Sequence, residues 1–289
     1  MENQLTTGFY DGPEEALERP RKQFSPTLTA SVNSKGVLDI DTVKGCTSGM
    51  KAYPDGGCYN LCYAAKLAKL YGYDFSKSIS RGYGIENYNS KQILLSFVGE
   101  VGSVQIARLV KRHTLEWFRI GTMGDPCHDW DMTLSVCRWL TVFNKAPVIV
   151  TKHWITLTDE QLVAFSDCGA VFNTSISALD NPAEIRHRMK QFNRIKEHSI
   201  KSILRIVSCK FGDTTWGREK SKDQADLFKN IPHIDNPLRI PATDKRVLSG
   251  DIIAGRFEDL NSKVSVSVAH EDAYFGHCND CPDQCGLNL

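Results

Sequence analysis

The chain has 289 residues, a length that suits one large α/β domain or two small ones, and its formal charge of +1 gives no global electrostatic case for nucleic-acid binding. Hydrophobic residues make up 41% of it, as in an ordinary globular protein, and no apolar run reaches the roughly 20 residues that a membrane-spanning helix needs. The N-terminus is polar and acidic, unlike a signal peptide, which predicts a cytoplasmic protein.

The first 36 residues are rich in Pro, Glu, Ser and Thr and show no clear periodicity, so we expect an N-terminal extension. From Gly36 on, short β-branched runs alternate with amphipathic stretches, which predicts a parallel sheet with right-handed crossovers. The expected strands are Val37–Val43, Trp117–Gly121, Val148–Thr151, Val171–Ile176, Ser202–Ser208 and Leu238–Ile240. The expected helices are Leu61–Tyr71, Trp130–Phe143, Thr158–Ser166, Pro182–His198 and Asp223–Lys229.

A long insertion, 77–113, separates the first helix from the second strand and carries helical patterns at Lys91–Leu95 and Val101–His113. Six strand–helix units are fewer than the eight of a closed barrel, and periodicity alone fits both an open doubly wound sheet and a partial barrel. The expected organisation is an extension at 1–36, a main domain at 37–250, and a cysteine-rich extension at 251–289 with a strand-like run at Lys263–Val268.

Ten cysteines in a chain without an export signal argue against a disulfide framework, which is typical of small secreted domains. Six of them form two tight groups, which indicates metal or iron–sulfur ligation. Cys46, Cys58 and Cys62 follow the first expected strand, where α/β proteins carry active-site loops. Three thiolates leave a metal or cluster with an open coordination position. A structural zinc site and three unrelated buried thiols are the alternatives.

The second group, Cys278, Cys281 and Cys285, lies at the C-terminus with C-x2-C-x3-C spacing. Three thiolates so close together suit an iron–sulfur cluster or zinc. Zinc would require His277 as its fourth ligand, and adjacent His and Cys side chains strain to meet one tetrahedral ion. We therefore expect a second, auxiliary [4Fe–4S] cluster, with Cys209 or the substrate as its fourth ligand. A metal-free thiol tail is the third alternative.

The pattern GC…GC…CYAAKLA resembles the radical S-adenosylmethionine (SAM) enzymes, in the branch of spore photoproduct lyase-like proteins and phage proteins with a CYA-type cluster loop. The usual superfamily loop is C-x3-C-x2-C, and the C-x11-C-x3-C spacing here departs from it in both intervals. Three further segments resemble that branch in the same order: Phe118–Pro126 (FRIGTMGDP), Val148–Lys152 (VIVTK) and Val171–Asp180 (VFNTSISALD). The resemblance covers about residues 37–210.

The resemblance implies a partial (β/α)6 TIM-like barrel, with a [4Fe–4S] cluster on Cys46, Cys58 and Cys62 and SAM on its fourth iron. One electron from a donor such as flavodoxin or ferredoxin would release a 5′-deoxyadenosyl radical, which abstracts hydrogen from a substrate. The residues expected to contact SAM are Gly121, Thr122, Gly124, Asp125, Lys152, Ser175, Ser177 and Arg188.

Several of these residues also have a purely structural explanation. Asp125 precedes Pro126 and would serve equally as a helix N-cap or turn residue. Lys152 would be a surface lysine after a strand, and Ser175 and Ser177 would be polar strand residues. His128 and Lys152 are the candidates for direct catalysis, because both follow strand ends.

The substrate implied by the branch is a nucleotide or modified DNA base, for instance an amino-acid-decorated thymine of phage DNA that is rearranged, which favours an isomerase or lyase in the host cytoplasm. A peptide-modifying radical SAM enzyme is the rival hypothesis. A hypothesis of another class is a non-catalytic, zinc-stabilised nucleic-acid-binding protein, which predicts a colourless protein with stoichiometric zinc.

Overall fold

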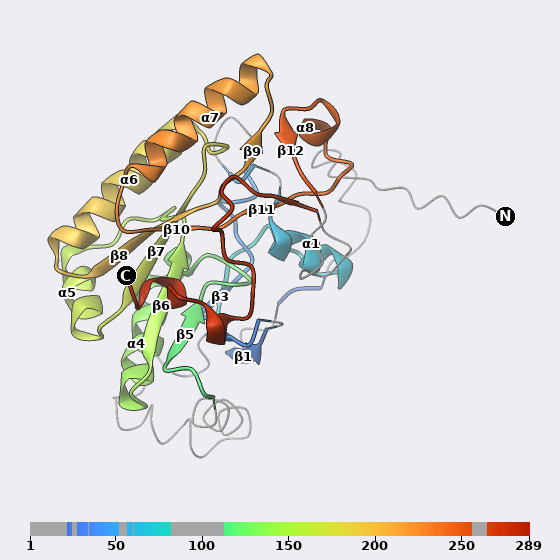
Figure 1. Ribbon diagram of the computed structural model, residues 1–289. Coiled ribbons are helices and arrows are strands. Elements are labelled where there is room, and N and C mark those ends of the chain that lie inside the picture. Colours follow the sequence, from blue (N-terminus) through green and yellow to red (C-terminus); the bar gives the residue numbers. More distant parts are fainter. Residues whose placement is uncertain are drawn as a thin grey trace.

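The computed structural model describes residues 22–24, 28–33, 35–51, 57–59, 61–81, 113–255 and 265–289. A seven-stranded sheet in the order β1-β2-β5-β6-β7-β8-β10 forms its centre (Figure 1). Only β1 runs antiparallel to its neighbour β2, and all other neighbours in this sheet are parallel. Its strands are Thr29–Val32 (β1), Leu38–Asp41 (β2), Trp117–Ile120 (β5), Ala146–Thr151 (β6), Val171–Ile176 (β7), Lys201–Ile206 (β8) and His233–Asp235 (β10).

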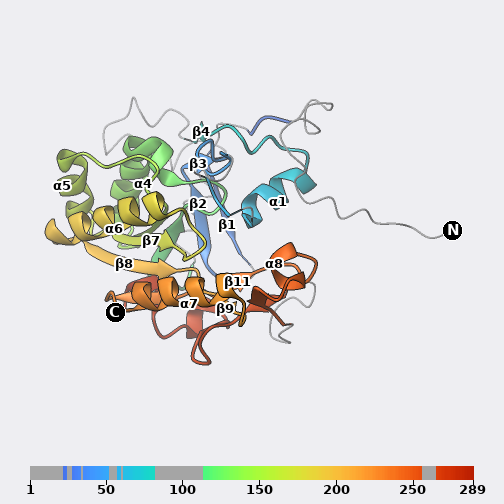
Figure 2. The same cartoon turned by 90° about the horizontal axis from the view of Figure 1, so that it is seen from above.

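The six parallel strands follow one another in chain order, so the sheet has no point at which the order reverses, as it does in a doubly wound fold. Helices connect them and flank the sheet, with α4, α5 and α6 gathered beside β6 to β8 (Figure 2). The expected α/β class with a parallel sheet is therefore confirmed. The main helices are Tyr63–Leu70 (α1), Trp130–Val142 (α4), Asp159–Asp167 (α5), Pro182–Glu197 (α6) and Thr215–Phe228 (α7).

Local sequence signals set the starts of these helices. Thr158 and Gln161 form a reciprocal capping box at α5, and Asn181 caps α6 ahead of Pro182, whose missing N–H costs nothing at the first turn. Asp129 caps α4 by accepting the N–H of Met132. These caps explain why the helix starts expected from the sequence agree closely with the observed ones.

Alternating side chains divide the sheet into two buried faces. Phe118, Ile149 and Phe172 pack against the helices in the largest apolar cluster. Trp117 and Ile203 point to the other face, where the C-terminal segment crosses the sheet (red in Figure 1). Full burial of each such side chain contributes about 1.5–3 kcal/mol to stability, so both faces help to hold the sheet.

The sixth strand of the sheet differs from the expected one. His233–Asp235 (β10) pairs with β8, whereas Leu238–Arg239 (β11) pairs antiparallel with Val266–Ser267 (β13) in a separate ribbon. The prediction of Leu238–Ile240 as the sixth parallel strand was wrong because β10 carries a single aliphatic side chain, Ile234, and gives no hydrophobic signal. The strand expected within Lys263–Val268 is confirmed in part by β13.

Three other boundaries differ from expectation. The run Val37–Val43 divides, because β2 ends at Asp41 and Val43–Lys44 (β3) turns away to pair with Ile79–Ser80 (β4). The expected extension contributes the edge strand β1 to the sheet. Helix α7 begins eight residues before Asp223, because Thr214 caps it by accepting the N–H of Gly217.

The helical patterns expected at Lys91–Leu95 and Val101–His113 lie outside the described residues, except for His113 itself. Within the described ranges, no helix is both long and apolar enough to cross a bilayer. The remaining short elements are Pro126–Asp129 (η3), Lys210–Phe211 (β9), Lys245–Leu248 (α8), Ile252–Ile253 (β12), Cys278–Asp280 (η4) and Gln284–Gly286 (η5).

Candidate functional site

The loop that carries the first cysteines lies against the loop that follows β5, at the carboxyl ends of the parallel strands. Gly45 donates its N–H to the carbonyl oxygen of Met123 (2.9 Å) and forms an isolated bridge with Gly124. A Cβ at Gly124 would lie 2.5 Å from the carbonyl oxygen of Val43, so only glycine permits this approach. The cysteine loop and the GTMGDP segment therefore lie side by side, as the family resemblance implies.

Cys46 and Cys58 converge on one glycine. Gly49 donates its N–H to the Sγ of Cys46 (3.2 Å), and its carbonyl oxygen accepts the N–H of Cys58 (2.9 Å). A Cβ at Gly49 would lie 2.8 Å from the Sγ of Cys46 and 3.4 Å from the Sγ of Cys58. The sulfurs of Cys46 and Cys58 thus occupy the space that a side chain at Gly49 would take.

Cys62 is the third member and occupies the N-cap position of α1, at the positive end of the helix dipole. Burial raises the pKa of its thiol, and the N–H groups of Ala64 and Ala65 oppose that shift. Burial also raises the pKa of Cys58 to about 12, while Lys152 opposes the shift and Cys62 adds to it. These thiols are protonated at neutral pH, so a metal that bound them would release protons.

The donor set of this group is soft and sulfur-rich. Among the described residues, no group of three or more His, Cys, Asp or Glu side chains is arranged so that it could hold a metal ion. A cubane cluster differs from a single ion, because each of its cysteines binds a different iron and the sulfurs stand further apart. Three neighbouring thiols and a backbone N–H directed at the sulfur of Cys46 are a donor set that fits such a cluster.

His128, one of the two catalytic candidates, lies at the first cysteine group. Its Nε2 is 3.7 Å from the Sγ of Cys46, and burial lowers the pKa of the ring, with Asp125 opposing. The imidazole is therefore neutral near pH 7 and can donate to sulfur or bind a metal. Asp129, its neighbour, caps α4 by accepting the N–H of Met132.

Both carboxylate oxygens of Asp125 accept hydrogen bonds from other residues of this chain. Its Oδ1 accepts from the Oγ1 of Thr151 (2.6 Å) and from the N–H of Cys127 (3.1 Å), and its Oδ2 accepts the N–H of Lys152 (2.8 Å). The expected N-cap role at η3 is confirmed. Asp125 ties the end of β5 to the end of β6, and thereby fixes the backbone from which Lys152 projects.

The side chain of Lys152 ends on a buried carboxylate, Asp180. Its Nζ lies 3.2 Å from the Oδ1 of Asp180, and the guanidinium of Arg188, which is fully buried, lies 2.6 Å from Oδ2. Burial would raise the pKa of Asp180, but the two cations hold it below its ordinary value. The structure thus joins two predicted SAM contacts through a residue that the sequence analysis did not single out.

The remaining predicted contacts line the same edge of the sheet. The N–H groups of Thr122 and Met123 both donate to Oδ1 of Asp41 (2.9 and 2.7 Å), which holds the loop after β5. Gly121 begins that loop with φ +100°, which favours glycine. Ser177 donates its hydroxyl to the carbonyl oxygen of Val207 (2.8 Å) and is fully buried, so this hydroxyl fastens β7 to β8.

Two site residues escaped the sequence analysis. Tyr59 lies between the two cysteines of the C-x3-C pair, and its ring faces the Nζ of Lys152, 5.1 Å from the ring centroid. His153 is fully buried after β6, with its Nε2 3.0 Å from the Oγ1 of Thr174. Neither position shows a periodic or spacing signal, although an aromatic residue inside a cysteine pair was a cue that could have been followed.

The C-terminal cysteines lie on the sheet face opposite the main helices. Cys285 accepts the side-chain N–H of Asn173 at its carbonyl oxygen (2.9 Å), and its Sγ lies 3.8 Å from Nη1 of Arg205. Burial raises the pKa of Cys278, and Cys285 and Cys281 add to the shift, which places the three thiols near one another. They form a second group, separate from the first.

Cys209, the predicted fourth ligand of the auxiliary cluster, lies apart from this group. Cys209 belongs to a different apolar cluster, with Leu179 and Ile240, and its N–H is bound by Gln224. The structure therefore does not bring Cys209 to the C-terminal thiols, contrary to that expectation. The ring of His277 packs over Gly36, and its Nδ1 accepts the N–H of Asn279. No family model, curated protein or solved structure matches this chain.

Proposed function

We propose that this protein is a radical SAM enzyme that binds a [4Fe–4S] cluster through Cys46, Cys58 and Cys62. The observation that carries the proposal is the convergence of two sulfurs over Gly49, with Cys62 at the start of α1, beside the loop after β5. The sequential order of the parallel strands also supports a sheet that curves into a partial (β/α)6 barrel.

When bound, such a cluster with SAM on its fourth iron would supply the reductive cleavage that yields a 5′-deoxyadenosyl radical. This chain's residues would orient SAM and exclude water. Asp41 holds the backbone of Thr122 and Met123 at the cluster loop, and Asp125 holds that of Lys152. Asp180 keeps the ammonium of Lys152 beside Cys58, where it suits the carboxylate of an amino-acid ligand.

The second group of thiols supports an auxiliary [4Fe–4S] cluster on Cys278, Cys281 and Cys285. These thiols pack against one face of the sheet, beside Trp117 and Val171 at the starts of β5 and β7, whereas the first group lies at the carboxyl ends of the strands. A substrate would therefore bind between the two groups. We propose a nucleotide or modified DNA base as this substrate, rearranged or cleaved by an isomerase or lyase. Flavodoxin or ferredoxin would be the electron donor, and the cytoplasm the compartment.

Anaerobic reconstitution with iron and sulfide tests the assignment. We expect a brown protein with about seven or eight irons per chain if both groups hold cubanes, and release of 5′-deoxyadenosine from SAM under a reductant. The double variant C58A/C62A should lose about half of the iron and all SAM cleavage. Cys168→Ala, which changes a cysteine at the end of α5, is the matched control and should retain both. SAM cleavage by C58A/C62A would contradict the proposal.

The zinc hypothesis has one observation in its favour. His128 approaches the Sγ of Cys46, which adds an imidazole to the three sulfurs of the first group. These are the donor types of a structural zinc site, although within the described ranges they are not arranged to hold a single metal ion. A zinc protein would be colourless after reconstitution and would contain stoichiometric zinc. Metal analysis of protein purified without oxygen separates the two functions, and His128→Ala should lower zinc content in the second case alone.

A further inference from the structure

Lys35, Arg119 and Arg205 lie near the C-terminal thiols, and Arg239 lies near Lys35. Two of these four cations project from the central sheet. Trp117 and Ile203 belong to the apolar cluster that the C-terminal segment covers. Arg119 lies two residues after Trp117 in β5, and Arg205 lies two residues after Ile203 in β8. Side chains two residues apart on a strand share a face. Both guanidinium groups therefore lie on the face that the C-terminal segment crosses.

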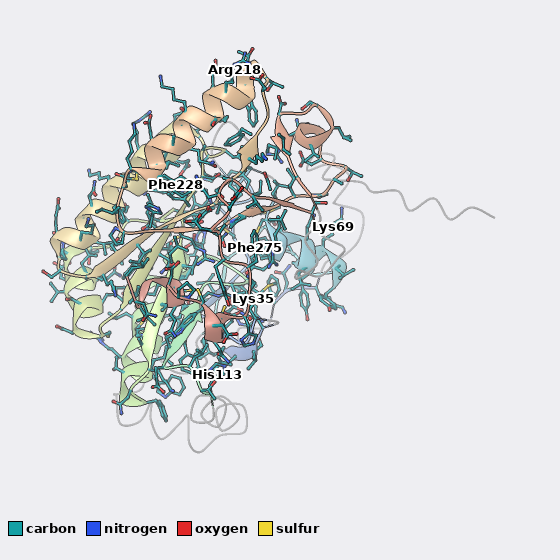
Figure 3. The ribbon with its side chains drawn as sticks, viewed as in Figure 1. Lys35, Lys69, His113, Arg218, Phe228 and Phe275 are labelled. Carbon is teal, nitrogen blue, oxygen red and sulfur yellow. The ribbon has the colours of Figure 1, made fainter. Side chains whose placement is uncertain are left out.

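The other two cations, Lys35 and Arg239, lie outside the central sheet. Lys35 lies in the turn before β2, where its carbonyl oxygen accepts the N–H of Cys278 (2.9 Å), and Figure 3 shows it beside the C-terminal segment. Arg239 lies in β11 and is exposed. Burial lowers the pKa of Lys35, Arg239 and Arg205 lower it further, and Cys278 opposes them. These side chains are thus close enough to repel one another.

Only one of the four cations has a carboxylate partner. Arg119 forms a two-bonded ion pair with Asp39 (2.8 and 2.9 Å). Within the described ranges, no carboxylate lies at ion-pair distance from Lys35, Arg205 or Arg239. We call these three residues the cation cradle. The side chain of Arg205 is fixed by Asn236 (2.9 Å) and by the Sγ of Cys285 (3.8 Å).

The cysteines do not account for this charge. Protonated thiols leave all three positive charges of the cradle uncompensated. Three thiolates around a divalent core, whether zinc or an oxidised cubane, carry a single net negative charge and still leave an excess. The whole chain is nearly neutral at +1, so the excess is local. Half-buried like charges are unfavourable without an anion between them, and a bound anion would remove that cost.

We propose that the cation cradle binds the phosphate group of a nucleotide substrate. Arg205 supplies a planar, fixed fork suited to phosphate oxygens, and Lys35 supplies a point charge beside it. Arg239 faces solvent, so an anion can enter from outside.

Arg119, the fourth cation, interacts electrostatically both with Cys285 and with Tyr63, the residue that follows Cys62 at the start of α1. This inference rests on the proposed function for the identity of the substrate, whereas binding of the anion depends on the cations alone.

Calorimetric titration of the anaerobically reconstituted protein with dTMP, thymidine and oligothymidylate tests the inference. We expect dTMP to bind and thymidine, which lacks the phosphate, to bind at least about tenfold more weakly. Arg205→Gln and Lys35→Gln should each weaken dTMP binding about tenfold or more, because each removes a charge-assisted contact. Arg205→Lys should restore part of the affinity. Arg138→Gln, which removes an exposed arginine of α4, should bind dTMP like the wild type.

Equal binding of dTMP and thymidine, or normal dTMP binding by both Gln variants, would overturn the inference. Loss of iron from these variants with unchanged dTMP affinity would also overturn it, since the cations would then serve only the thiolates. If oligothymidylate binds but dTMP does not, and Arg205→Gln loses the oligothymidylate binding, the phosphate recognised by the cradle belongs to a DNA strand. Circular dichroism of each variant identifies a folding defect, and SAM cleavage is measured separately, so the proposed function can fail while the phosphate site stands.

Discussion

Asp180 holds two cations on one buried carboxylate. Lys152 arrives from the end of β6 and Arg188 from within α6, and the N–H of Ser177 binds the same carboxylate (2.8 Å). Arg188 also donates to the carbonyl oxygen of Lys152 (3.0 Å), and its guanidinium lies 4.7 Å from the ring centroid of Trp154. This small network therefore fixes the position of the lysine whose ammonium acts on Cys58 and faces the ring of Tyr59.

Asp180→Asn should be strongly destabilising, because it leaves two cations near a neutral amide in a buried site. Breaking a buried charge pair by removing one partner costs about 3–5 kcal/mol. Urea unfolding should show the loss as a lower midpoint with an unchanged slope. Asp226→Asn removes an exposed partner of Lys229 on α7 and is the matched control, which should unfold like the wild type. A stability equal to that of the control would show that the network is not needed for folding.

At the residue scale, the sequence predicted which positions meet but not how each side chain is used. Asp125 was expected either to bind SAM or to cap a helix, and the structure uses both carboxylate oxygens within the chain. Asp180 lay in a quoted motif without being chosen, because its partners come from two other elements. Long-range partnerships of this kind have no local sequence signal, and they decide whether a polar side chain is free for a ligand.

The cysteine loop depends on one glycine, Gly49, which lies between Cys46 and Cys58. Gly49 binds Cys46 through its N–H and Cys58 through its carbonyl oxygen, while its missing Cβ makes room for both sulfurs. The two cysteines that bound the irregular C-x11-C interval thus meet at Gly49. The spacing could not predict this, because the closure depends on backbone hydrogen bonds inside the loop.

Gly49→Ala should impair cluster assembly more than folding. Its new methyl carbon would lie 2.8 Å from the Sγ of Cys46, so the sulfur must move. We expect iron content after anaerobic reconstitution to fall to about half, as the first cluster is lost, with near-normal circular dichroism. Gly255→Ala is the control, since its added Cβ meets no atom within 4 Å. Full iron content in Gly49→Ala would mean that the sulfurs do not bind where the structure places them.

The strands show where hydrophobic patterning succeeds as a predictor. Residues Val171–Ile176 were predicted without error, because four of the six residues of this buried strand, Val171, Phe172, Thr174 and Ile176, are apolar or β-branched. The edge strand β10 was missed in favour of Leu238–Arg239, since one face of an edge strand needs few apolar residues. The hydrophobic pattern of the sequence therefore identified the central strands of the sheet, whereas its edge strands depend on pairing with distant residues.

At the scale of the whole molecule, the buried His153 makes stability depend on pH. Burial lowers its pKa to about 3, with Asp125 opposing and His187 adding to the shift. The unfolded chain binds a proton at this residue near pH 6.5, so the unfolded state holds more protons between about pH 3 and 6.5. Stability should therefore fall as the pH drops through 6.5, by about 2 kcal/mol at pH 5 from this residue.

Urea unfolding at pH 7 and pH 5 measures this dependence. His153→Phe fills the space between Trp130 and Phe172 and removes the titrating group, so its loss between the two pH values should be smaller than that of the wild type by about 2 kcal/mol. The hydrogen bond to Thr174 is absent from the variant at both pH values and cancels in the comparison. Identical losses in the two proteins would contradict a neutral, buried His153.

The C-terminal segment has a consequence for synthesis of the protein on the ribosome. Cys285 and Leu287 complete the apolar cluster that covers Trp117, Val171 and Ile203, and Cys278 binds Lys35 in the turn before β2. The helix-facing core can form while the chain is still growing, but this second face stays uncovered until residues 278–287 have left the exit tunnel. A nascent chain paused before Cys278 would thus present an apolar sheet face to chaperones, and emergence of that segment would conceal it.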